Sequence, residues 1–495
     1  MTSPTETSLQ EQAALISARL DRLPTTRYVW KLVVLLSLGG CFEFYDLFLM
    51  TYIGPGLIRS GLFAGASVSF FGLTGLASFV AATFAGLFIG TIAFGFTADR
   101  LGRRAIFTYS LLWYTAASIV MAFQNSTEGI LLWRLIAGVG IGVELVTIDT
   151  YIAELVPKEI RGRAFALNQV VQFTAIPLVA LVAWLLVPGK PLGLEGWRWV
   201  VLIGSVSAIF VWSIRRQIPE SPRWLIAQGR LAEAEKAIAG METRVVQESG
   251  RELAPPVVPP AAGTAAPDPI SFIRIFQPPY FGRTAMLTVF QLAQTIGYYG
   301  FSSWVPTLLI AAGIQTTASL GYSFVIAIFA PVGPLLIQGI ADRFERKWQI
   351  VVASGVTVVL GLLFAFQSRP ELLILLGILI TGANTLMSFA YHPYQAELYP
   401  TAIRARAVGY VYSFSRLSTI FTSFMIAFCL QHFGTAGVFV FISLSMLMVM
   451  LSIGIFGPLT RGRSLEDIAH GDRAALPGEE DLRPRTMGLQ GRLKS

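Results

Sequence analysis

The chain has 495 residues, of which 54% are hydrophobic and only 13% carry a charge. An ordinary soluble domain carries about 25% charged residues, so a soluble enzyme of this length would lack the polar surface it needs. The 12% of aromatic residues also excludes a disordered protein, because disordered chains are poor in aromatics.

Apolar segments long enough to cross a membrane occur twelve times along the chain. A helix needs roughly 20 apolar residues to span the ~30 Å hydrocarbon layer. The first six predicted helices cover residues 30–52, 79–97, 105–123, 129–149, 164–187 and 197–214. The second six cover residues 283–305, 318–340, 348–366, 371–391, 406–428 and 434–457. The sequence therefore predicts an all-α membrane protein with twelve transmembrane helices.

Three polar segments lie outside these helices. They are an N-terminal tail, a central loop and a C-terminal tail, at residues 1–29, 215–282 and 458–495. They separate two six-helix halves, at residues 30–214 and 283–457. The central loop is rich in Ala, Glu, Arg and Lys through about Gln247, which predicts surface helices. Its remainder is rich in Pro and Ala, which predicts a flexible linker.

One face of the N-terminal tail is apolar. Residues 8–23 place Leu9, Ala13, Ile16 and Leu20 on the same side of a helix. Such a face is typical of a short helix that lies in the membrane interface. A frayed tail is the alternative, and the sequence leaves both open.

Basic residues are unevenly distributed between the two ends of the predicted helices. Of the 37 Lys and Arg residues, 31 lie in the tails, the central loop and the turns after even-numbered helices. Because basic residues gather in cytoplasmic loops, both termini are predicted to be cytoplasmic, in an inner membrane. The same distribution accounts for the net charge of +8 without nucleic-acid binding.

The two halves contain a repeat. AELVPKEIRGRA, from Ala153, matches AELYPTAIRARA, from Ala396, at an offset of 243 residues. At the same offset, Asp99 and Arg100 match Asp342 and Arg343. Two motifs at one shared offset indicate a duplicated six-helix unit. This is the architecture of transporters whose two halves rock about a site at the membrane midplane.

Two loop motifs resemble a known family. Residues 95–104, GFTADRLGRR, fit the GxxxD[RK]xG[RK][RK] loop of the major facilitator superfamily, although Gln338 and Glu345 replace the glycines in the second copy. Residues 219–225, PESPRWL, resemble a signature of its sugar-porter-like and organic-ion-transporter-like branches. The resemblance implies the major facilitator fold, with two pseudo-symmetric six-helix halves, and a metabolite:proton symporter type of activity.

Charged residues at the predicted cytoplasmic turns form a candidate gate. Such a cluster can hold the two halves together when the binding site faces outward. The alternative is that these residues serve only topology and folding. The predicted gate consists of Asp99, Arg103, Arg104, Glu154, Arg161, Asp342, Arg343, Glu397 and Arg404.

Acidic residues on the first helix form a candidate proton site. Asp46 lies about six residues before that helix leaves the membrane, and Arg134 lies about six residues after the fourth helix enters from the same side. A helix rises ~1.5 Å per residue, so the two share a depth at which they can pair. FYDLFL, residues 44–49, is similar to the first helix of sugar porters, which implies that Asp46 carries a proton. A permanent structural ion pair is the alternative, and Glu43 is the rival carrier.

Arg416 is the candidate substrate-binding cation. It stands about ten residues into the eleventh helix, near the midplane, and its own helix offers no acidic partner. A substrate carboxylate would satisfy it with two parallel hydrogen bonds. Organic-anion-transporter-like proteins are similar in carrying a midplane arginine on that helix. The alternative is a pair with Glu144 or Asp149; Asp149 and its repeat equivalent His392 are candidates for the inner gate or the proton exit.

Uncharged polar residues on the apolar helices complete the candidate site. Polar residues in a membrane helix avoid lipid and point inward, toward a ligand or toward another helix. The predicted cavity residues are Gln169, Gln172, Gln291, Gln294, Tyr298, Tyr299 and Asn384. The glycine pairs Gly86/Gly90 and Gly138/Gly142 have the spacing of close helix packing instead.

The sequence thus predicts a proton-coupled symporter of a small organic anion that works by alternating access. A sugar or polyol porter is the alternative within transport, and a degenerate transporter that acts as a receptor or scaffold is the alternative outside it. Its partners would be the substrate, the proton and the bilayer, with no nucleic acid, and the chain would be monomeric. The chain has two cysteines and three histidines, and it has no P-loop, CxxC or HExxH pattern. The sequence therefore predicts no enzyme activity, cofactor or metal site.

Overall fold

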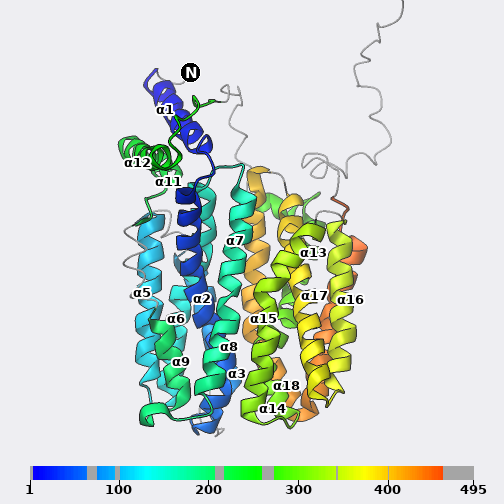
Figure 1. Ribbon diagram of the computed structural model, residues 1–495. Coiled ribbons are helices and arrows are strands. Elements are labelled where there is room, and N and C mark those ends of the chain that lie inside the picture. Colours follow the sequence, from blue (N-terminus) through cyan, green and yellow to red (C-terminus); the bar gives the residue numbers. More distant parts are fainter. Residues whose placement is uncertain are drawn as a thin grey trace, which may run out of the picture.

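Two helical bundles stand side by side in the computed structural model, which describes residues 4–63, 75–94, 101–206, 217–258, 272–341, 344–399 and 401–460 (Figure 1). All regular secondary structure among these residues is helical, and none of it is a strand. Three helices outside the bundles, α1 (Pro4–Asp21), α11 (Pro222–Ala227) and α12 (Leu231–Ser249), cover one end of the first bundle. We call this end of the molecule the α12 end.

The first bundle, the N half, begins after the cap residue Thr26, whose side chain accepts a hydrogen bond from the Val29 amide. Ser126 caps another of its helices by accepting from the Gly129 amide. Both caps satisfy amides that have no partner within the helix. The N half consists of α2 (Arg27–Arg59), α3 (Leu76–Phe94), α5 (Arg103–Ala122), α6 (Thr127–Leu155), α7 (Arg161–Phe173), α8 (Ala175–Leu186) and α9 (Gly196–Ser205), with the 3₁₀ turn η1 (Pro191–Gly193).

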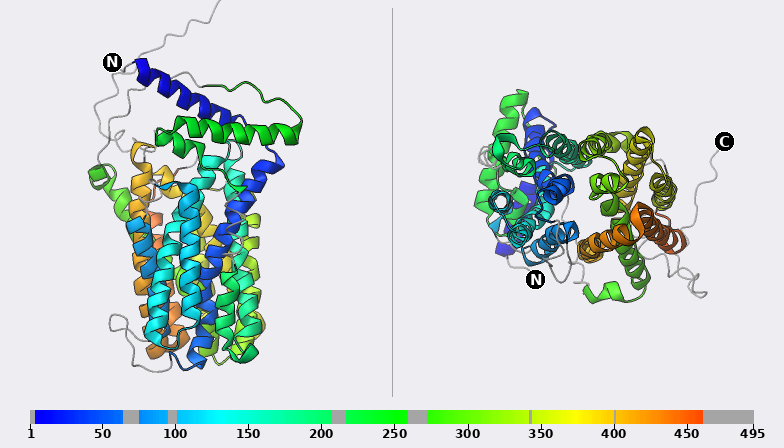
Figure 2. Two further views of the ribbon diagram at one scale, coloured as in Figure 1. Left: turned by 90° about the vertical axis from the view of Figure 1, so that its left-hand side faces the viewer. Right: turned by 90° about the horizontal axis from the view of Figure 1, so that it is seen from below.

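The second bundle, the C half, lies beside the first when the molecule is seen along the helices (Figure 2). Its last helix is interrupted at Gly434, where the backbone has φ 66° and ψ −165°, so that it passes through the bundle twice. The C half consists of η2 (Phe272–Phe276), α13 (Phe281–Ser302), α14 (Val305–Ala311), α15 (Thr316–Ala341), α16 (Arg346–Ala365), α17 (Pro370–Glu397) and α18 (Thr401–Phe456).

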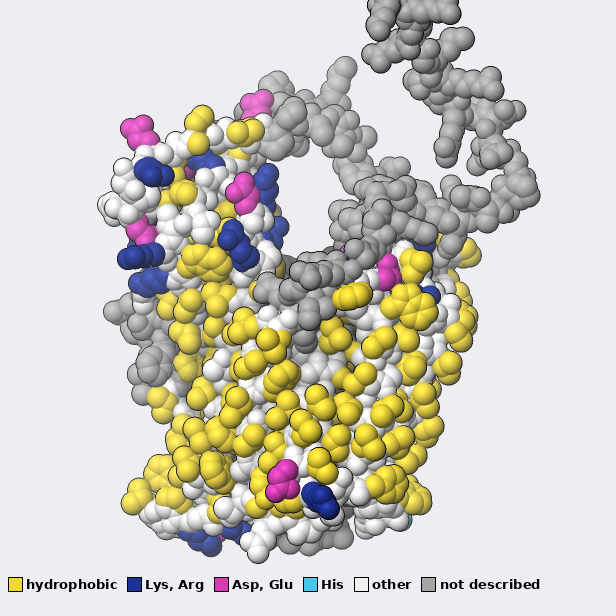
Figure 3. All heavy atoms as spheres, turned by 45° about the vertical axis from the view of Figure 1, so that its right-hand side comes forward, with side chains coloured by type: hydrophobic (Ala, Val, Ile, Leu, Met, Phe, Trp, Pro, Cys, Tyr) yellow, Lys and Arg dark blue, Asp and Glu magenta, His cyan; other side chains and the backbone are white. Residues whose placement is uncertain are grey.

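The bundles have the dimensions of membrane-spanning domains. Among the described residues, eight helices are long and apolar enough to cross a membrane, and α18 is long enough to cross twice. The shorter α3 and α9 and the more polar α13 occupy the other predicted spans. Figure 3 shows a broad belt of hydrophobic side chains between charged ones at the two ends of the molecule. The predicted all-α membrane fold is confirmed.

Glycines bring α3 and α6 into close contact. A Cβ atom on Gly86 would lie 2.3 Å from the Leu135 carbonyl oxygen, and one on Gly138 would lie 2.5 Å from the Thr83 carbonyl oxygen. No side chain fits at either position without moving backbone. The structure therefore uses these glycines for helix packing, as their spacing indicates.

The tail helix α1 packs on α12. Ile16 and Leu20 are buried in the same apolar cluster as Ile238 and Met241, and Figure 2 shows the two helices lying across the end of the N half. Arg19 adds ion pairs of 2.5 Å to Glu242 and to Glu235. The expected helix is present and the frayed tail is wrong. The apolar face of the helix contacts α12, a partner that the tail sequence alone does not contain.

The two loop motifs contact each other through hydrogen bonds at the α12 end. The Glu220 carboxylate accepts hydrogen bonds from the backbone amides of Arg104, at 3.2 Å, and Ser221, at 3.1 Å. Arg223 donates to the Ala153 carbonyl oxygen at 3.0 Å. The PESPRWL segment thus ties α11 to the ends of α5 and α6.

Candidate functional site

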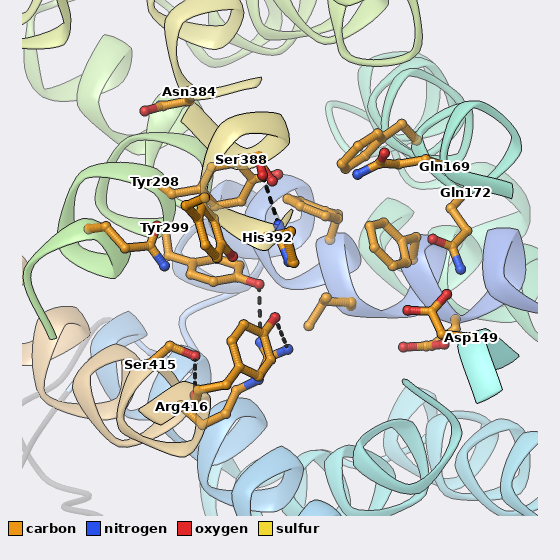
Figure 4. Close-up of a pocket in the computed structure, with 18 residues that line it drawn as sticks. Asp149, Gln169, Gln172, Tyr298, Tyr299, Asn384, Ser388, His392, Ser415 and Arg416 are labelled. Atoms are coloured by element: carbon orange, nitrogen blue, oxygen red, sulfur yellow. Dashed lines mark hydrogen bonds between the residues drawn. The ribbon is translucent and has the colours of Figure 1, made fainter. Parts of the chain in front are cut away.

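A cavity of about 150 Å³ lies between the two halves. Its wall comes from α2, α6 and α7 on one side and from α13, α17 and α18 on the other (Figure 4). Of the residues predicted for a site, Glu43, Gln169, Gln172, Gln294, Tyr298, Asn384 and Arg416 line it. The structure thus brings most of the predicted substrate-binding residues to one place.

Arg416 is buried in the cavity wall, with 5% of its surface exposed. Its guanidinium donates to the Tyr299 hydroxyl at 3.2 Å and to the Tyr412 hydroxyl at 3.1 Å. It also lies over the Tyr412 ring, 5.1 Å from the centroid. Among the described residues no carboxylate oxygen lies within 4.0 Å of it, so it pairs with neither Glu144 nor Asp149. In the described part of the chain the cation therefore has hydroxyl partners and no ion pair.

Asp46 and Arg134 form the buried contact that their depths indicate. The guanidinium donates to the Asp46 carboxylate at 2.9 Å and to the Asp46 carbonyl oxygen at 2.7 Å. Its Nε donates to the Thr83 hydroxyl at 2.8 Å, and Ser118 donates to the second Asp46 oxygen at 2.9 Å. Neither residue of the pair lines the cavity. This arrangement can hold a charge pair in the membrane and can release it if a proton arrives at Asp46.

Gln291 does not line the cavity, contrary to the expectation. It is fully buried and donates to the Gln395 side chain at 2.9 Å, while Gln294 donates back to it at 3.2 Å. The i, i+3 spacing does put both amides on one face of α13, but that face points at α17 as well as at the cavity. Gln291 therefore holds Gln294 in position by a hydrogen bond, without lining the cavity itself.

Several cavity residues were absent from the predicted set. Tyr412 stands four residues before Arg416 on α18, and Ser388 stands four before His392 on α17, where the His392 ring nitrogen contacts the Ser388 carbonyl oxygen at 2.8 Å. Side chains four apart share a helix face. The i−4 position from each candidate charge is the signal that identifies them. Tyr391 and Ser415 also line the cavity and were not predicted, whereas Tyr299, which also lines it, was expected there.

The cavity continues toward the α12 end. A second cavity of about 750 Å³ at that end shares Asp149, Gln172 and His392 with the first. On the other side of the site the described residues line a pocket of about 50 Å³. There Trp184 of α8 stacks on Phe324 of α15, with ring centroids 5.8 Å apart. Among the described residues, the space beside the site is thus wider toward the α12 end than on the other side.

Three of the predicted gate residues, Arg103, Glu154 and Glu397, form ion pairs within their own half, the last with Arg346, which was not predicted for the gate. Arg103 contacts Glu154 at 3.1 Å in the N half, and Arg346 pairs with Glu397 in the C half. The Arg104 amide is bound by Glu220, and Arg161 begins α7 at the same end. Three predicted gate residues, Asp99, Asp342 and Arg343, lie outside the described residues, as does the side chain of Arg404.

The whole chain resembles known transporters. The family model for "Sugar (and other) transporter" matches residues 32–471. The chain belongs to this family. It is 29% identical to the putative metabolite transport protein YyaJ of Bacillus subtilis, over 90% of this chain and 96% of that one. It is 26% identical to the niacin transporter NiaP of Acinetobacter baylyi, over 91% and 99%.

A solved structure shares the fold. The xylose transporter XylE from Escherichia coli, in a partially occluded inward open conformation, aligns with a TM-score of 0.71 and 19% identity, over 89% of this chain and 100% of that one. Together these comparisons confirm a multi-pass membrane transporter of the major facilitator superfamily, with twelve helices in two pseudo-symmetric halves. It is a transporter and not an enzyme.

Proposed function

We propose that this transporter carries a small organic anion together with protons across the inner membrane. The observation that carries the proposal is Arg416, a buried cation in the cavity wall whose hydrogen-bond partners are two tyrosine hydroxyls. A charge at membrane depth is costly without a counter-charge. A carboxylate in the cavity would supply that counter-charge and accept two parallel hydrogen bonds from the guanidinium.

The size of the cavity favours a metabolite. Sites for drug-sized ligands measure about 300–1,000 Å³, and this cavity measures about 150 Å³. Gln172, Gln294 and Asn384 are placed to contact the uncharged part of the substrate. The name of the related niacin transporter fits this chemistry, since niacin is a small aromatic carboxylate.

We further propose that Asp46 carries the coupled proton. Protonation would neutralise the carboxylate and weaken its ion pair with Arg134, so that the proton is linked to the state of the α2–α6 contact. A solved relative in fold is described as a D-xylose-proton symporter, which supports proton coupling in this architecture. A permanent structural pair remains the alternative, and Glu43 remains the rival carrier.

The α12 end is the proposed cytoplasmic side, because basic residues gather in the segments on that side. The conformation described here then faces inward. In the outward-facing conformation, charged residues of the α12-end turns would contact each other across the two halves and close the cytoplasmic side. The Arg103–Glu154 and Arg346–Glu397 pairs would hold these turns in position within each half.

Uptake into proteoliposomes tests the proposal. The panel consists of labelled small carboxylates, among them nicotinate, their matched carboxamides, and xylose, each with and without acid outside. We expect uptake of one or more carboxylates, stimulated by outside acid, and no uptake of the matched amides. If acid does not stimulate uptake, symport is wrong. An Asp46→Asn variant should exchange substrate without concentrating it, and undiminished accumulation would reject Asp46 as the carrier.

A sugar or polyol porter is the second candidate. The amide side chains in the cavity favour it, since Gln169, Gln172 and Gln294 are suited to hydroxyl groups. The same panel separates the two. Uptake of xylose or another neutral polyol in preference to every carboxylate would establish the sugar porter and remove the anion assignment.

A further inference from the structure

A second pair of acidic side chains is buried beside the cavity. Glu43 on α2 and Glu144 on α6 are both 0% exposed. Glu144 reaches the surface of α2 one turn before Glu43, because its Oε1 atom lies 3.5 Å from the Cβ position of Gly39. Residues 39 and 43 share a helix face. The two carboxyl groups therefore face each other across the α2–α6 contact, and they interact electrostatically.

The protein offers this pair almost no hydrogen bonds. Among the described residues neither Glu43 oxygen has a partner, and Oε1 of Glu144 has none. The second Glu144 oxygen accepts only from the Ser110 hydroxyl, at 3.5 Å. The hydroxyl of Tyr114, which interacts electrostatically with both carboxyl groups, is likewise buried without a partner in the described part of the chain. Two carboxylates without donors or a cation cannot both stay ionised at this depth.

The other charged and titratable groups around Glu43 do not neutralise the pair. Asp149 on α6 acts on Glu43 as a further negative charge, and Arg416 on α18 acts as a positive one but bonds to tyrosines instead. Tyr299 on α13 also interacts with Glu43. His392 on α17 lines the same cavity as Glu43. No ion pair of Glu43 or Glu144 occurs within the described part of the chain.

We propose that Glu43 and Glu144 form a second proton-binding site, in which the two carboxyl groups share a proton that exchanges with the α12-end cavity past Asp149. Glu43 lines the central cavity, and Asp149 lines both that cavity and the one at the α12 end, where its side chain is exposed. Loading moves one proton from cavity water to a carboxylate oxygen, and unloading returns it to water. No other bond changes.

This site is separate from the Asp46–Arg134 pair, and it extends the proposed function by naming Glu144 and a further proton. Asp46 follows Glu43 by three residues on α2 but is saturated by Arg134 and Ser118. The two acidic positions of α2 thus have opposite partners: a cation at Asp46 and a second acid at Glu43. Only the second arrangement needs a bound proton while the Asp46 pair is intact.

Infrared spectroscopy of the full chain in lipid bilayers tests the site with the proton itself as the probe. We expect the C=O stretching band of a protonated carboxyl group at neutral pH, which shifts in D₂O and disappears as the pH of the medium rises. In Glu144→Gln the remaining Glu43 has lost a negative neighbour, so its band should disappear at a pH lower by about one unit or more.

The controls decide the assignment. Asp46→Asn, the same change one turn away, should leave the band in place, and the double variant Glu43→Gln/Glu144→Gln should lose it. A wild-type protein without the band, a band that ignores D₂O and pH, or a band that persists in the double variant would each overturn the proposal. The wild-type titration needs no variant to fold. Because no substrate is used, failure of organic-anion transport would leave this result unaffected, and the reverse also holds.

Discussion

The molecule contains two buried arginines, one in each half, whose surroundings differ. Arg134 in the N half is 0% exposed and Arg416 in the C half is 5% exposed. Arg134 has a carboxylate, a carbonyl oxygen and a hydroxyl as acceptors, whereas Arg416 has two tyrosine hydroxyls. The same cation is thus neutralised within the protein in one place and left with polar neighbours alone in the other. This difference is the reason for proposing a role in proton coupling for Arg134 and a role in substrate binding for Arg416.

The internal repeat sharpens this contrast. The pairs Arg103–Glu154 and Arg346–Glu397 stand at equivalent positions of the two halves and make the same contact. Under the same offset of 243 residues, however, Arg134 corresponds to Gly377 and Arg416 corresponds to Phe173. The halves therefore share the charges of their α12-end turns and differ in the charges at membrane depth. The duplicated unit supplies the frame, and single substitutions within it supply the sites.

The largest effect is expected on folding stability, from removal of each arginine in turn. Arg134→Leu leaves Asp46 buried without its cation, and breaking such a pair costs about 3–5 kcal/mol. Arg416→Leu removes a cation that has no ion pair within the described part of the chain, so the loss of stability should be much smaller. Thermal unfolding of both variants in the same detergent measures the difference. Equal losses would contradict the distinction between the two arginines.

The next effect is expected on substrate affinity. A hydrogen bond to a charged group contributes about 1.5–3 kcal/mol, so Arg416→Gln should weaken carboxylate binding by roughly 10- to 100-fold. Arg416→Lys keeps the charge but loses the planar pair of donors, and should fall between wild type and Gln. Competition for uptake by the best carboxylate of the panel gives the affinities. Unchanged affinity in Arg416→Gln would end the argument for an anion.

The sequence was sufficient for these two arginines because their placement depends on depth alone. A regular rise per residue puts Asp46 and Arg134 at one level, and helix length puts Arg416 near the midplane. Glu43 was likewise identified as a membrane-depth acid. Glu144 is also a membrane-depth acid in the sequence, but depth alone does not place it beside Glu43. The rotation of α6 about its axis decides which neighbour Glu144 faces.

The polar part of the site was harder to predict for two physical reasons. Spacing fixes the face of α13 but not which neighbour that face meets, and so Gln291 contacts Gln395 rather than the cavity. The predicted fourth and tenth helices also end too early, at residues 149 and 391, whereas α6 continues to Leu155 and α17 to Glu397. Hydropathy falls where a helix lines a water-filled cavity, so the stretch that carries Asp149 and His392 was placed at a helix end.

A smaller effect is expected from the tyrosine that holds Arg416. Tyr412→Phe removes a hydroxyl that accepts from the guanidinium at 3.1 Å but keeps the ring beneath it. The hydroxyl only positions the guanidinium, whose own bonds to the substrate remain, so carboxylate affinity should change by less than tenfold, that is by less than about 1.4 kcal/mol. Tyr391→Phe, at a ring that lines the same cavity without a hydrogen bond to Arg416, is the matched control. A loss in Tyr412→Phe as large as in Arg416→Gln would show that the tyrosine itself binds the substrate.

The smallest effect is expected for the ion pairs of Arg19 and Arg22 with Glu242, which are partly exposed to water rather than buried in the membrane. Burial alone would raise the pKa of Glu242, but hydrogen bonds from Arg19 and Arg22, with their charges, outweigh it and leave the pKa below its ordinary value. A lowered carboxyl pKa contributes stability that is present above the ordinary value of about 4.3. This contribution is lost as the pH falls through the lowered pKa, so acid should loosen α1 from α12.

Glu242→Gln should produce the same loosening at neutral pH, by about 1 kcal/mol, the upper end for partly exposed pairs. Hydrogen exchange of the α1 amides, corrected for the intrinsic effect of pH, measures it. Glu235→Gln is the control, because Glu235 also contacts Arg19 but is half exposed, and its loss should be smaller. Equal exchange in the two variants would mean that the apolar contacts of Ile16 and Leu20 hold α1 without help from the charges. We expect an arginine ion pair to matter most where it is buried in the membrane. A loss of stability in Glu242→Gln as large as that in Arg134→Leu would contradict this.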